Sequence, residues 1–308
     1  MTESKLNPPT RSIRCGEASL KEGKNVGQEY ILTLACCDAP GIVASIAGTI
    51  AEIGGNIIES SQFGDPQTGR FFMRVKFSAS NEVSKSEIVT ALEQPGEKYE
   101  MEWRLYEASR PTKTVIMASK TDHCLNDLVY RWRMGTLPID IVRIISNHKD
   151  VEHIAELNNI PFTYAPVTKG TKDNQEQQLR ELFVKDGAEL IVLARYMQIL
   201  SDKLSKDYFG SIINIHHSFL PGFKGAKPYH RAHDRGVKLI GATAHYVTPD
   251  LDEGPIIEQE VERVNHAMNV TDLIAAGRDI ERRVLAKAVR YHIEHRVLIN
   301  DGKTVAFL

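Results

Sequence analysis

The fold of the second half of the chain is indicated by one stretch, Ile213-Asn214-Ile215-His216-His217-Ser218-Phe219-Leu220-Pro221-Gly222. Its first residues fit a buried strand, and Ser218 with Pro221-Gly222 ends that strand. Residues two apart in a strand project to the same face, so Asn214 and His216 point together while the isoleucines point to the other side. The strand therefore places an amide and an imidazole side by side at its carboxyl end.

Short apolar strands alternate with helical segments on both sides of this stretch. Strands are predicted around residues 114–118, 140–146, 161–164, 190–194, 212–216 and 239–247. Helices are predicted up to about residue 134, around 151–157 and 174–185, and over the long amphipathic segment 271–291. Near-continuous apolar strands between helices are typical of a parallel sheet covered on both faces, a Rossmann-like arrangement. Such sheets bind ligands at the carboxyl ends of their strands, where Asn214 and His216 are expected to lie.

The first part of the chain has a different order of elements. After a polar lead-in over residues 1–28, strands are predicted at 30–37, 56–63, 70–77 and 99–106, and helices at 41–54 and 83–92. This βαββαβ order in about 80 residues is the ferredoxin-like arrangement. The run Ala108-Ser109-Arg110-Pro111 marks a boundary. We therefore expect an α/β protein with one domain over residues 29–110 and a second over residues 111–308.

The composition argues against several classes of protein. A length of 308 residues suits about two domains. The 38 lysines and arginines against 40 aspartates and glutamates give a formal net charge of −2, unlike the positive charge of a dedicated nucleic-acid binder. The sequence has no apolar run near the roughly 20 residues that a membrane span needs, and no signal-peptide pattern. The four cysteines (Cys15, Cys36, Cys37 and Cys124) have neither disulfide nor metal-knuckle spacing. We expect a cytoplasmic protein without nucleic-acid or membrane partners.

An acidic loop can add a carboxylate to the amide and the imidazole. It follows the strand predicted at 239–247 and reads Thr248-Pro249-Asp250-Leu251-Asp252-Glu253-Gly254-Pro255. An amide N–H can stabilise charge on a carbonyl oxygen, and an imidazole can carry a proton. Together with an aspartate, these groups suffice for hydrolysis or transfer of an acyl group without a nucleophilic side chain. From residue types alone, a satisfied polar pair at a sheet edge is the commoner explanation.

Longer motifs resemble the formyltransferase family that uses 10-formyltetrahydrofolate. They are Asn214-Ile215-His216-x-Ser218-x-Leu220-Pro221-x-Phe223-Lys224-Gly225, Gly241-Ala242-Thr243-Ala244-His245 and Asp250-Leu251-Asp252-Glu253-Gly254-Pro255-Ile256-Ile257. The resemblance covers roughly residues 112–295. It implies that Asn214, His216 and Asp252 are catalytic. Asp252 is preferred over Asp250 because it comes immediately before Glu253-Gly254.

The resemblance also implies where the folate binds. The segment Leu193-Ala194-Arg195-Tyr196-Met197-Gln198-Ile199-Leu200 is similar to the part of the family that cradles the pterin. The implied substrate contacts are Met197, Gln198, Ile199, Leu200, Thr248 and Asp250. The folate derivative is itself the substrate, so the resemblance implies no cofactor and no metal.

The formyl acceptor depends on the loop after the first strand of this domain. In the glycinamide ribonucleotide transformylases of the family, that loop is rich in glycine, and its backbone N–H groups hold the phosphate of the acceptor. Here it reads Ser119-Lys120-Thr121-Asp122-His123-Cys124-Leu125, which lacks glycine and contains the anionic Asp122. A phosphorylated amine acceptor is therefore disfavoured, and water is the expected nucleophile.

The N-terminal unit resembles the ACT regulatory domain in the segments Asp38-Ala39-Pro40-Gly41-Ile42-Val43-Ala44 and Gly54-Gly55-Asn56-Ile57. The resemblance implies an amino-acid effector near Asp38, Gly41 and Asn56, and a homo-oligomer, a dimer or tetramer, because ACT units pair. An ACT unit before a formyltransferase-like domain is similar to the arrangement of the formyltetrahydrofolate deformylase family. That arrangement implies hydrolysis of 10-formyltetrahydrofolate to tetrahydrofolate and formate, which supplies purine biosynthesis and balances one-carbon folate pools.

Three other functions remain open from the sequence. One is a formyltransferase with another amine acceptor, although the near-neutral charge disfavours a tRNA-bound amine. Another is a metallohydrolase, although neither a cysteine pair nor a His-Glu-x-x-His motif accompanies the candidate ligands. Those ligands are His216, His217, His230, His233 and His245. The last is a non-catalytic sensor of folate and an amino acid, against which the presence of Asn214, His216 and Asp252 together argues.

A few further residues are expected to be structural. We expect His217 to face away from the catalytic side of its strand. His292 and His295 are expected to complement the dipole as cations at the end of the last helix. Tyr229 is expected to be a solvated loop residue.

Overall fold

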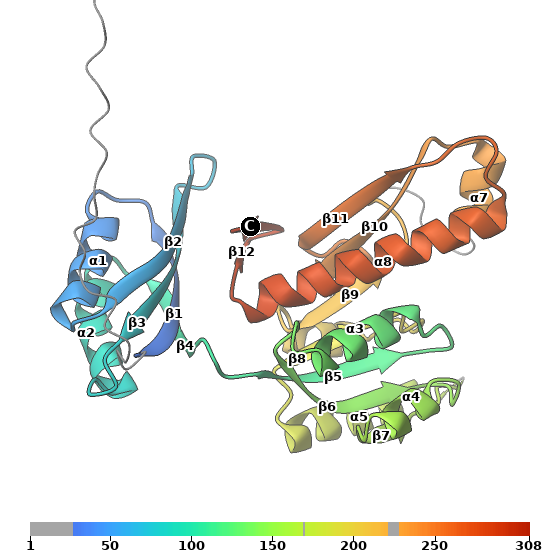
Figure 1. The fold of residues 1–308 in the computed structure, drawn as a ribbon, viewed down its shortest axis with the longest axis horizontal. Helices are drawn as coiled ribbons and strands as arrows, with labels where there is room; N and C mark the ends of the chain where they lie inside the picture. The colour runs from blue at the N-terminus through green and yellow to red at the C-terminus, as the bar shows by residue number, and fades with distance from the viewer. Residues whose placement is uncertain (1–26, 169, 221–227) are drawn as a thin grey trace, which may run out of the picture.

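The structure, a computed structural model, describes residues 27–168, 170–220 and 228–308 (Figure 1). Most of the lead-in over residues 1–28 and the Pro221-to-Gly225 part of the formyltransferase motif lie outside the described residues. The described residues form two sheet-containing units and a short C-terminal hairpin. The predicted α/β class is confirmed. Within the described residues, no helix is both long and apolar enough to cross a membrane.

The N-terminal unit is a four-stranded antiparallel sheet with two helices packed on it (Figure 1). Its elements are β1 (Gln28–Cys37), α1 (Ile42–Glu52), β2 (Asn56–Asp65), β3 (Arg70–Ala79), α2 (Lys85–Lys98) and β4 (Glu102–Glu107). The strand order is β2-β3-β1-β4. The predicted βαββαβ order is confirmed, and the fold agrees with an ACT-like unit.

Helix α2 is longer than the sequence indicates, since it passes through Pro95 and ends at Lys98. The Pro95-Gly96 pair favours an earlier end, because both residues are helix breakers. The helix instead packs closely on β4: a Cβ at Gly96 would lie 2.5 Å from Nε1 of Trp103. This close approach explains the glycine in the last turn and the later start of β4.

The C-terminal unit is built on a seven-stranded sheet with the order β11-β10-β9-β8-β5-β6-β7. Its strands are β5 (Thr112–Ala118), β6 (Ile139–Ser146), β7 (Phe162–Tyr164), β8 (Leu190–Leu193), β9 (Ile212–His216), β10 (Leu239–Tyr246) and β11 (Ile256–Arg263). Its helices are α3 (His123–Arg133), α4 (Glu152–Leu157), α5 (Lys172–Asp186), α6 (Asp202–Asp207), α7 (Pro228–Arg235) and α8 (Val270–Ile293). The strands from β9 to β7 are parallel, and β10 pairs antiparallel with both of its neighbours. The mostly parallel sheet is confirmed, whereas β11, α6 and α7 were not predicted.

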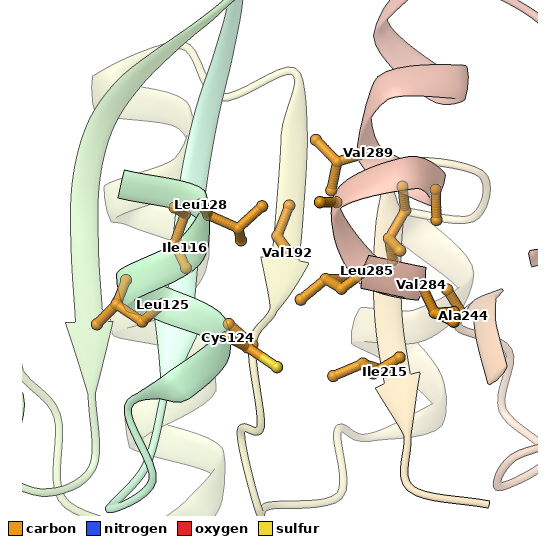
Figure 2. Close-up of a cluster of buried hydrophobic side chains, with 14 of the residues drawn as sticks. Ile116, Cys124, Leu125, Leu128, Val192, Ile215, Ala244, Val284, Leu285 and Val289 are labelled. Atoms are coloured by element: carbon orange, nitrogen blue, oxygen red, sulfur yellow. The ribbon is translucent and has the colours of Figure 1, made fainter. Parts of the chain in front are cut away.

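Helices α3 and α8 cover one face of this sheet, and apolar side chains fill the space between them (Figures 1 and 2). Ile215 of β9 lies in this cluster with Val192 of β8 and Leu285 of α8 (Figure 2). The alternation along β9 directs its other side chains, Asn214 and His216, away from the cluster. Burial of the isoleucines thus fixes which face of β9 is available for chemistry.

A C-terminal hairpin that the sequence did not predict lies between the two units (Figure 1). It consists of β12 (Val297–Asn300) and β13 (Lys303–Ala306). The Asn300 amide Nδ2 donates to Asp65 Oδ2 at 2.7 Å. The hairpin therefore connects the end of α8 to the β2–β3 turn of the N-terminal unit.

A buried arginine joins the N-terminal sheet to the end of α8. Arg74 is 1% exposed, and its Nε donates to the Glu294 carbonyl at 2.9 Å. Its Nη1 pairs with Glu59 Oε2 at 3.2 Å, and Arg296 binds the same carboxylate at 2.7 Å. Because a buried charge is tolerated only when it is paired, this network ties the two units together.

Two half-buried histidines lie at the end of α8, at the same contact. His292 Nδ1 and the Tyr246 hydroxyl are hydrogen-bonded at 2.8 Å, and the His295 ring stacks on Tyr106 with centroids 3.4 Å apart. Burial lowers the pKa of His292 to about 4. Burial and nearby positive charges lower the pKa of His295 to about 3. The expected cationic role of this pair is wrong, because both rings are neutral at pH 7.

These shifted pKa values predict an acid-sensitive contact. The unfolded chain takes up protons near pH 6.5, whereas the folded chain does so near 4 and 3, so the stabilisation is complete above pH 6.5 and is lost as the pH falls toward these values. His295→Phe keeps an aromatic ring against Tyr106. It should reduce the change in unfolding free energy between pH 7 and pH 4 by about 1–3 kcal/mol. Denaturant titrations at several pH values measure this change, and an unaltered pH dependence would contradict a neutral His295 ring packed on Tyr106.

Candidate active site

A pocket of about 310 Å³ at the carboxyl ends of β8 and β9 brings the three predicted catalytic side chains together. Asn214 and His216 project into it from β9, and Asp252 enters from the loop between β10 and β11. The predicted substrate contacts line the same pocket: Met197, Gln198, Ile199, Leu200, Thr248 and Asp250. We call it the catalytic pocket. Its lining combines apolar side chains with a few polar groups, as small-molecule sites commonly do.

His216 and Asp252 form the central pair of the catalytic pocket. His216 Nδ1 lies 3.3 Å from Asp252 Oδ2, and the His216 side chain is 6% exposed. Since a carboxylate only accepts, Nδ1 is assigned the proton. The other ring nitrogen, Nε2, is buried and has no hydrogen-bond partner among the described residues. This nitrogen is therefore available to a group bound in the pocket.

The backbone around Asp252 is adapted to deliver its carboxylate. Asp252 has a φ of +59°, in the left-handed region that aspartate and asparagine tolerate better than most residues. Two residues later, a Cβ at Gly254 would lie 1.7 Å from the Tyr246 carbonyl oxygen, so only glycine allows the loop to return this close to β10. Burial raises the pKa of Asp252, whereas the hydrogen bond from His216 and the charge interaction with His216 lower it. The net effect is a pKa below the usual value for an aspartate. The carboxylate is therefore ionised at neutral pH.

His245 is a site residue to which the sequence assigned no role in catalysis. It lies directly opposite Asn214 in the antiparallel β9–β10 register. Its Nδ1 donates to the Tyr246 carbonyl at 2.9 Å, which leaves Nε2 to accept from Asn214 Nδ2 at 3.2 Å. Burial lowers the pKa of His245, in keeping with a neutral ring. His245 thus orients the Asn214 amide, and the second N–H of that amide remains for a ligand.

His217 also lines the catalytic pocket, so the expectation that it faces the opposite side is wrong. β9 ends at His216, and strand alternation no longer applies to the next residue. The two imidazole rings meet edge to face with centroids 5.1 Å apart. Burial, Arg195 and His216 together lower the pKa of His217 to about 4. His217 is therefore a neutral wall of the pocket.

Behind the catalytic pocket, the buried Glu281 of α8 binds three side chains. Its Oε2 is 2.8 Å from His123 Nε2 and 3.4 Å from Arg195 Nε, and its Oε1 accepts from the Tyr229 hydroxyl at 2.6 Å. Burial raises the pKa of Glu281, but the contacts with His123, Arg195 and Tyr229 produce a net lowering. Tyr229 is 8% exposed, so its expected place in a solvated loop is wrong.

One group in the described part of the chain has the proximity needed to hold a metal ion: ligand atoms of His123, Cys124 and Glu281 lie within 4.8 Å of one another. Arg195 already supplies a positive charge to Glu281. Burial raises the pKa of the Cys124 thiol well above its usual range, so the thiol is a poor ligand. The contacts favour an internally satisfied cluster. His230, which the metallohydrolase alternative requires, is exposed and does not line the catalytic pocket.

The structure does not bring the three residues predicted to bind an effector together within one chain. Asp38 and Gly41 lie at the end of the sheet where Cys37 pairs with Arg70, whereas Asn56 lies at the opposite end, paired with Ser78. Asp38 follows β1, Gly41 precedes α1 with a φ of +94°, and Asn56 begins β2. All three are exposed in the single chain. An effector site between paired units stays a prediction.

Comparison with known proteins agrees with this fold and pocket. Residues 112–289 match the formyl transferase family. A formyltetrahydrofolate deformylase from Corynebacterium sp. (strain P-1) is 47% identical over 280 residues, which cover 90% of this chain and 97% of that protein. One from Synechocystis sp. is 49% identical over 277 residues, which cover 90% of this chain and 97% of that protein.

A solved structure extends the likeness to three dimensions. The crystal structure of formyltetrahydrofolate deformylase from Burkholderia mallei is 48% identical and has a TM-score of 0.88, covering 91% of this chain and 100% of that one. These identities span both units of the chain. The chain therefore belongs to the formyltetrahydrofolate deformylase family.

Proposed function

We propose that the chain hydrolyses 10-formyltetrahydrofolate to tetrahydrofolate and formate, with Asn214, His216 and Asp252 as its catalytic residues. The observation that carries this proposal is the convergence of the three side chains in one pocket. There, Nδ1 of His216 faces the ionised Asp252, and Nε2 on the other side of the ring has no partner among the described residues. The activity of the relatives agrees with it. The six other predicted residues of the pocket wall are suited to hold the folate.

Asn214 is positioned to stabilise the charge that develops on the formyl oxygen. When water adds to the formyl carbon, the carbonyl oxygen becomes negatively charged, and a fixed N–H donor stabilises that charge more than the neutral substrate. The bond from Asn214 Nδ2 to His245 fixes the amide orientation before substrate binds. The Asn214 amide therefore does not have to reorient during the reaction.

The His216–Asp252 pair moves the proton. A new C–O bond forms between water and the formyl carbon, and the water proton passes to the pair while Asp252 stabilises the imidazolium of His216. The bond between the formyl carbon and N10 then breaks, and His216 delivers the proton to N10. The products are tetrahydrofolate and formate. Because the two groups are coupled, the base is the pair rather than either residue alone.

The surroundings of the catalytic pocket favour water over an amine as the formyl acceptor. The loop after β5 contains no glycine, and its Ser119 hydroxyl donates to Asn147 Oδ1 at 2.6 Å and accepts from the Met197 N–H at 2.9 Å. The Glu281 carboxylate is already bound by His123, Arg195 and Tyr229. This leaves it little capacity to hold the ammonium group of an acceptor.

An assay without any acceptor tests the proposed function. The purified chain should convert 10-formyltetrahydrofolate to equal amounts of tetrahydrofolate and formate, followed by absorbance and by a formate assay. Added glycinamide ribonucleotide should neither accelerate turnover nor become formylated. Turnover that requires an amine would identify a formyltransferase, and folate binding without turnover would identify a sensor.

The wider setting of the reaction is also part of this proposal. In the cytoplasm, the released formate would supply purine biosynthesis and balance one-carbon folate pools. The N-terminal unit would bind an amino acid near Asp38 and Gly41 in a homo-oligomer, a dimer or tetramer, whereas Asn56 lies at the opposite end of the sheet in the same chain. The reaction would need no metal or other cofactor. Repeating the assay with a panel of amino acids, and separately with a chelator, checks these points.

A further inference from the structure

A second pocket adjoins the catalytic pocket, and the two share Arg195, Met197 and His217 in their walls. We call it the side pocket. Thr121 from the loop before α3 and Arg278 from α8 also line it. No role in the proposed mechanism is assigned to these polar groups, so the side pocket needs its own explanation.

The side pocket concentrates buried polar atoms that lack hydrogen bonds. Seven buried side-chain nitrogen and oxygen atoms in the described part of the chain have no hydrogen bond, and three of them belong to residues that line the side pocket. They are Thr121 Oγ1, Arg195 Nε and His217 Nδ1. An unpaired buried polar group is costly, so most such groups in proteins are paired with protein, water or ligand. Arg195 Nε has the 3.4 Å ion pair with Glu281, whereas Thr121 Oγ1 and His217 Nδ1 have no partner among the described residues. These two groups beside a guanidinium favour a polar occupant.

The charge of the side pocket favours an anion. Its lining contains two arginines, Arg195 and Arg278, and one carboxylate, Glu281. The net charge of the lining is therefore +1 when the histidines are neutral. Glu281 is held by Arg195, His123 and Tyr229, so its oxygens are already turned toward protein partners. Arg278 is exposed and has no ion-pair partner among the described residues. A small singly charged anion would balance the pocket.

We propose that Thr121, Arg195 and His217 form a subsite for formate, the carboxylate that the proposed hydrolysis releases. This inference rests on the proposed function. The two formate oxygens accept hydrogen bonds from the Thr121 hydroxyl, the Arg195 guanidinium and an N–H of His217, and no covalent bond changes. Because Arg195 and His217 border both pockets, formate can move from the reacting position into the subsite while the folate still fills the catalytic pocket.

Binding of ¹³C-formate to the folate-free protein tests the subsite without turnover. Line broadening of the formate signal should saturate at constant ionic strength. Thr121→Val, which replaces the hydroxyl with a methyl group, should weaken binding roughly tenfold, as expected for one hydrogen bond to a charged group. Product inhibition of the hydrolysis by formate should weaken by the same factor. Thr121→Ser restores the hydroxyl and should behave as the unaltered chain. Thr136→Val is the matched control, because Thr136 is exposed near the end of α3 and does not line the side pocket.

A second variant removes charge rather than the hydroxyl. Arg278→Gln should weaken formate binding about two- to fivefold, as expected for one exposed charge. Arg282→Gln, one turn further along α8 and paired with Asp279, should leave formate binding unchanged. Arg278 is exposed and the Arg282 side chain is 42% exposed, so neither variant should disturb folding.

The outcomes separate the subsite from the proposed function. Hydrolysis without saturable formate binding would overturn the subsite alone and indicate a pocket that holds only water. Formate binding in a chain that does not hydrolyse the folate would overturn the proposed function alone. Equal formate affinities for Thr121→Val and Thr136→Val would also overturn the subsite.

Discussion

Replacing Asp252 with asparagine is expected to lower kcat by about 10²–10⁴-fold, the range typical for loss of general acid–base catalysis. The reason is charge rather than shape. Asparagine fits the same space and tolerates the φ of +59° at this position. It no longer carries the negative charge that lies 3.3 Å from His216 Nδ1 and stabilises a protonated ring. The protonated His216 that carries the proton from water to N10 is therefore less stable, and the proton transfer becomes slower.

Initial rates at saturating 10-formyltetrahydrofolate measure this effect, with circular dichroism and denaturant unfolding as controls for folding. Asp250→Asn, two residues earlier in the same loop, distinguishes the two carboxylates. It is expected to change KM more than kcat, because Asp250 contacts bound folate rather than the reacting atoms in the proposed arrangement. A wild-type kcat for a folded Asp252→Asn variant would contradict the assignment of Asp252.

Replacing Asn214 with alanine is expected to lower kcat by about 10²–10³-fold, as loss of one oxyanion donor typically does. KM should change much less, because the hydrogen bond strengthens as charge develops on the formyl oxygen. His245 would remain in place, since its Nδ1 is held by the Tyr246 carbonyl at 2.9 Å. The loss should therefore report the missing donor rather than a displaced neighbour.

The separation of kcat from KM is the measurement for this second variant. Asn265→Ala provides a matched control, because Asn265 is an exposed asparagine in the turn before α8. It should retain both parameters. A loss confined to KM in Asn214→Ala would show that the amide only helps to bind the substrate and does not stabilise the transition state.

Local patterns in the sequence predict much of the catalytic pocket. The alternation in Ile213-Asn214-Ile215-His216 is enough to place the amide and imidazole on one face of β9, because the isoleucines must enter the core. The βαββαβ order follows from turn residues and periodicity in the same way. These are properties of neighbouring residues, which a single sequence displays directly.

Contacts between distant residues could not be predicted in this way. The partnership of Asn214 with His245 depends on the antiparallel register of β9 and β10, which nothing in either strand alone specifies. The cluster around Glu281 joins residues as far apart as His123 and α8, so only the packed core defines it. The sequence signal that could have found His245 was its place in the Gly241-to-His245 motif, to which no role was given.

Burial changed the expected behaviour of several residues. Position at a helix end favours charged His292 and His295, but packing against Tyr246 and Tyr106 makes both rings neutral. Tyr229 similarly belongs to the core through Glu281 rather than to a solvated loop. In each case the cost of placing a charge or a hydroxyl in an apolar environment decides the outcome, and that environment exists only after folding.

Hydrolysis in water enriched in ¹⁸O tests the central claim most directly. If water attacks the formyl carbon, formate released without any acceptor should contain one oxygen atom from the solvent, detected by mass spectrometry after a single turnover. The Asp252→Asn chain should release such formate about 10²–10⁴-fold more slowly. Release of unlabelled formate, or recovery of the formyl group on an amine instead of as formate, would contradict hydrolysis by this site.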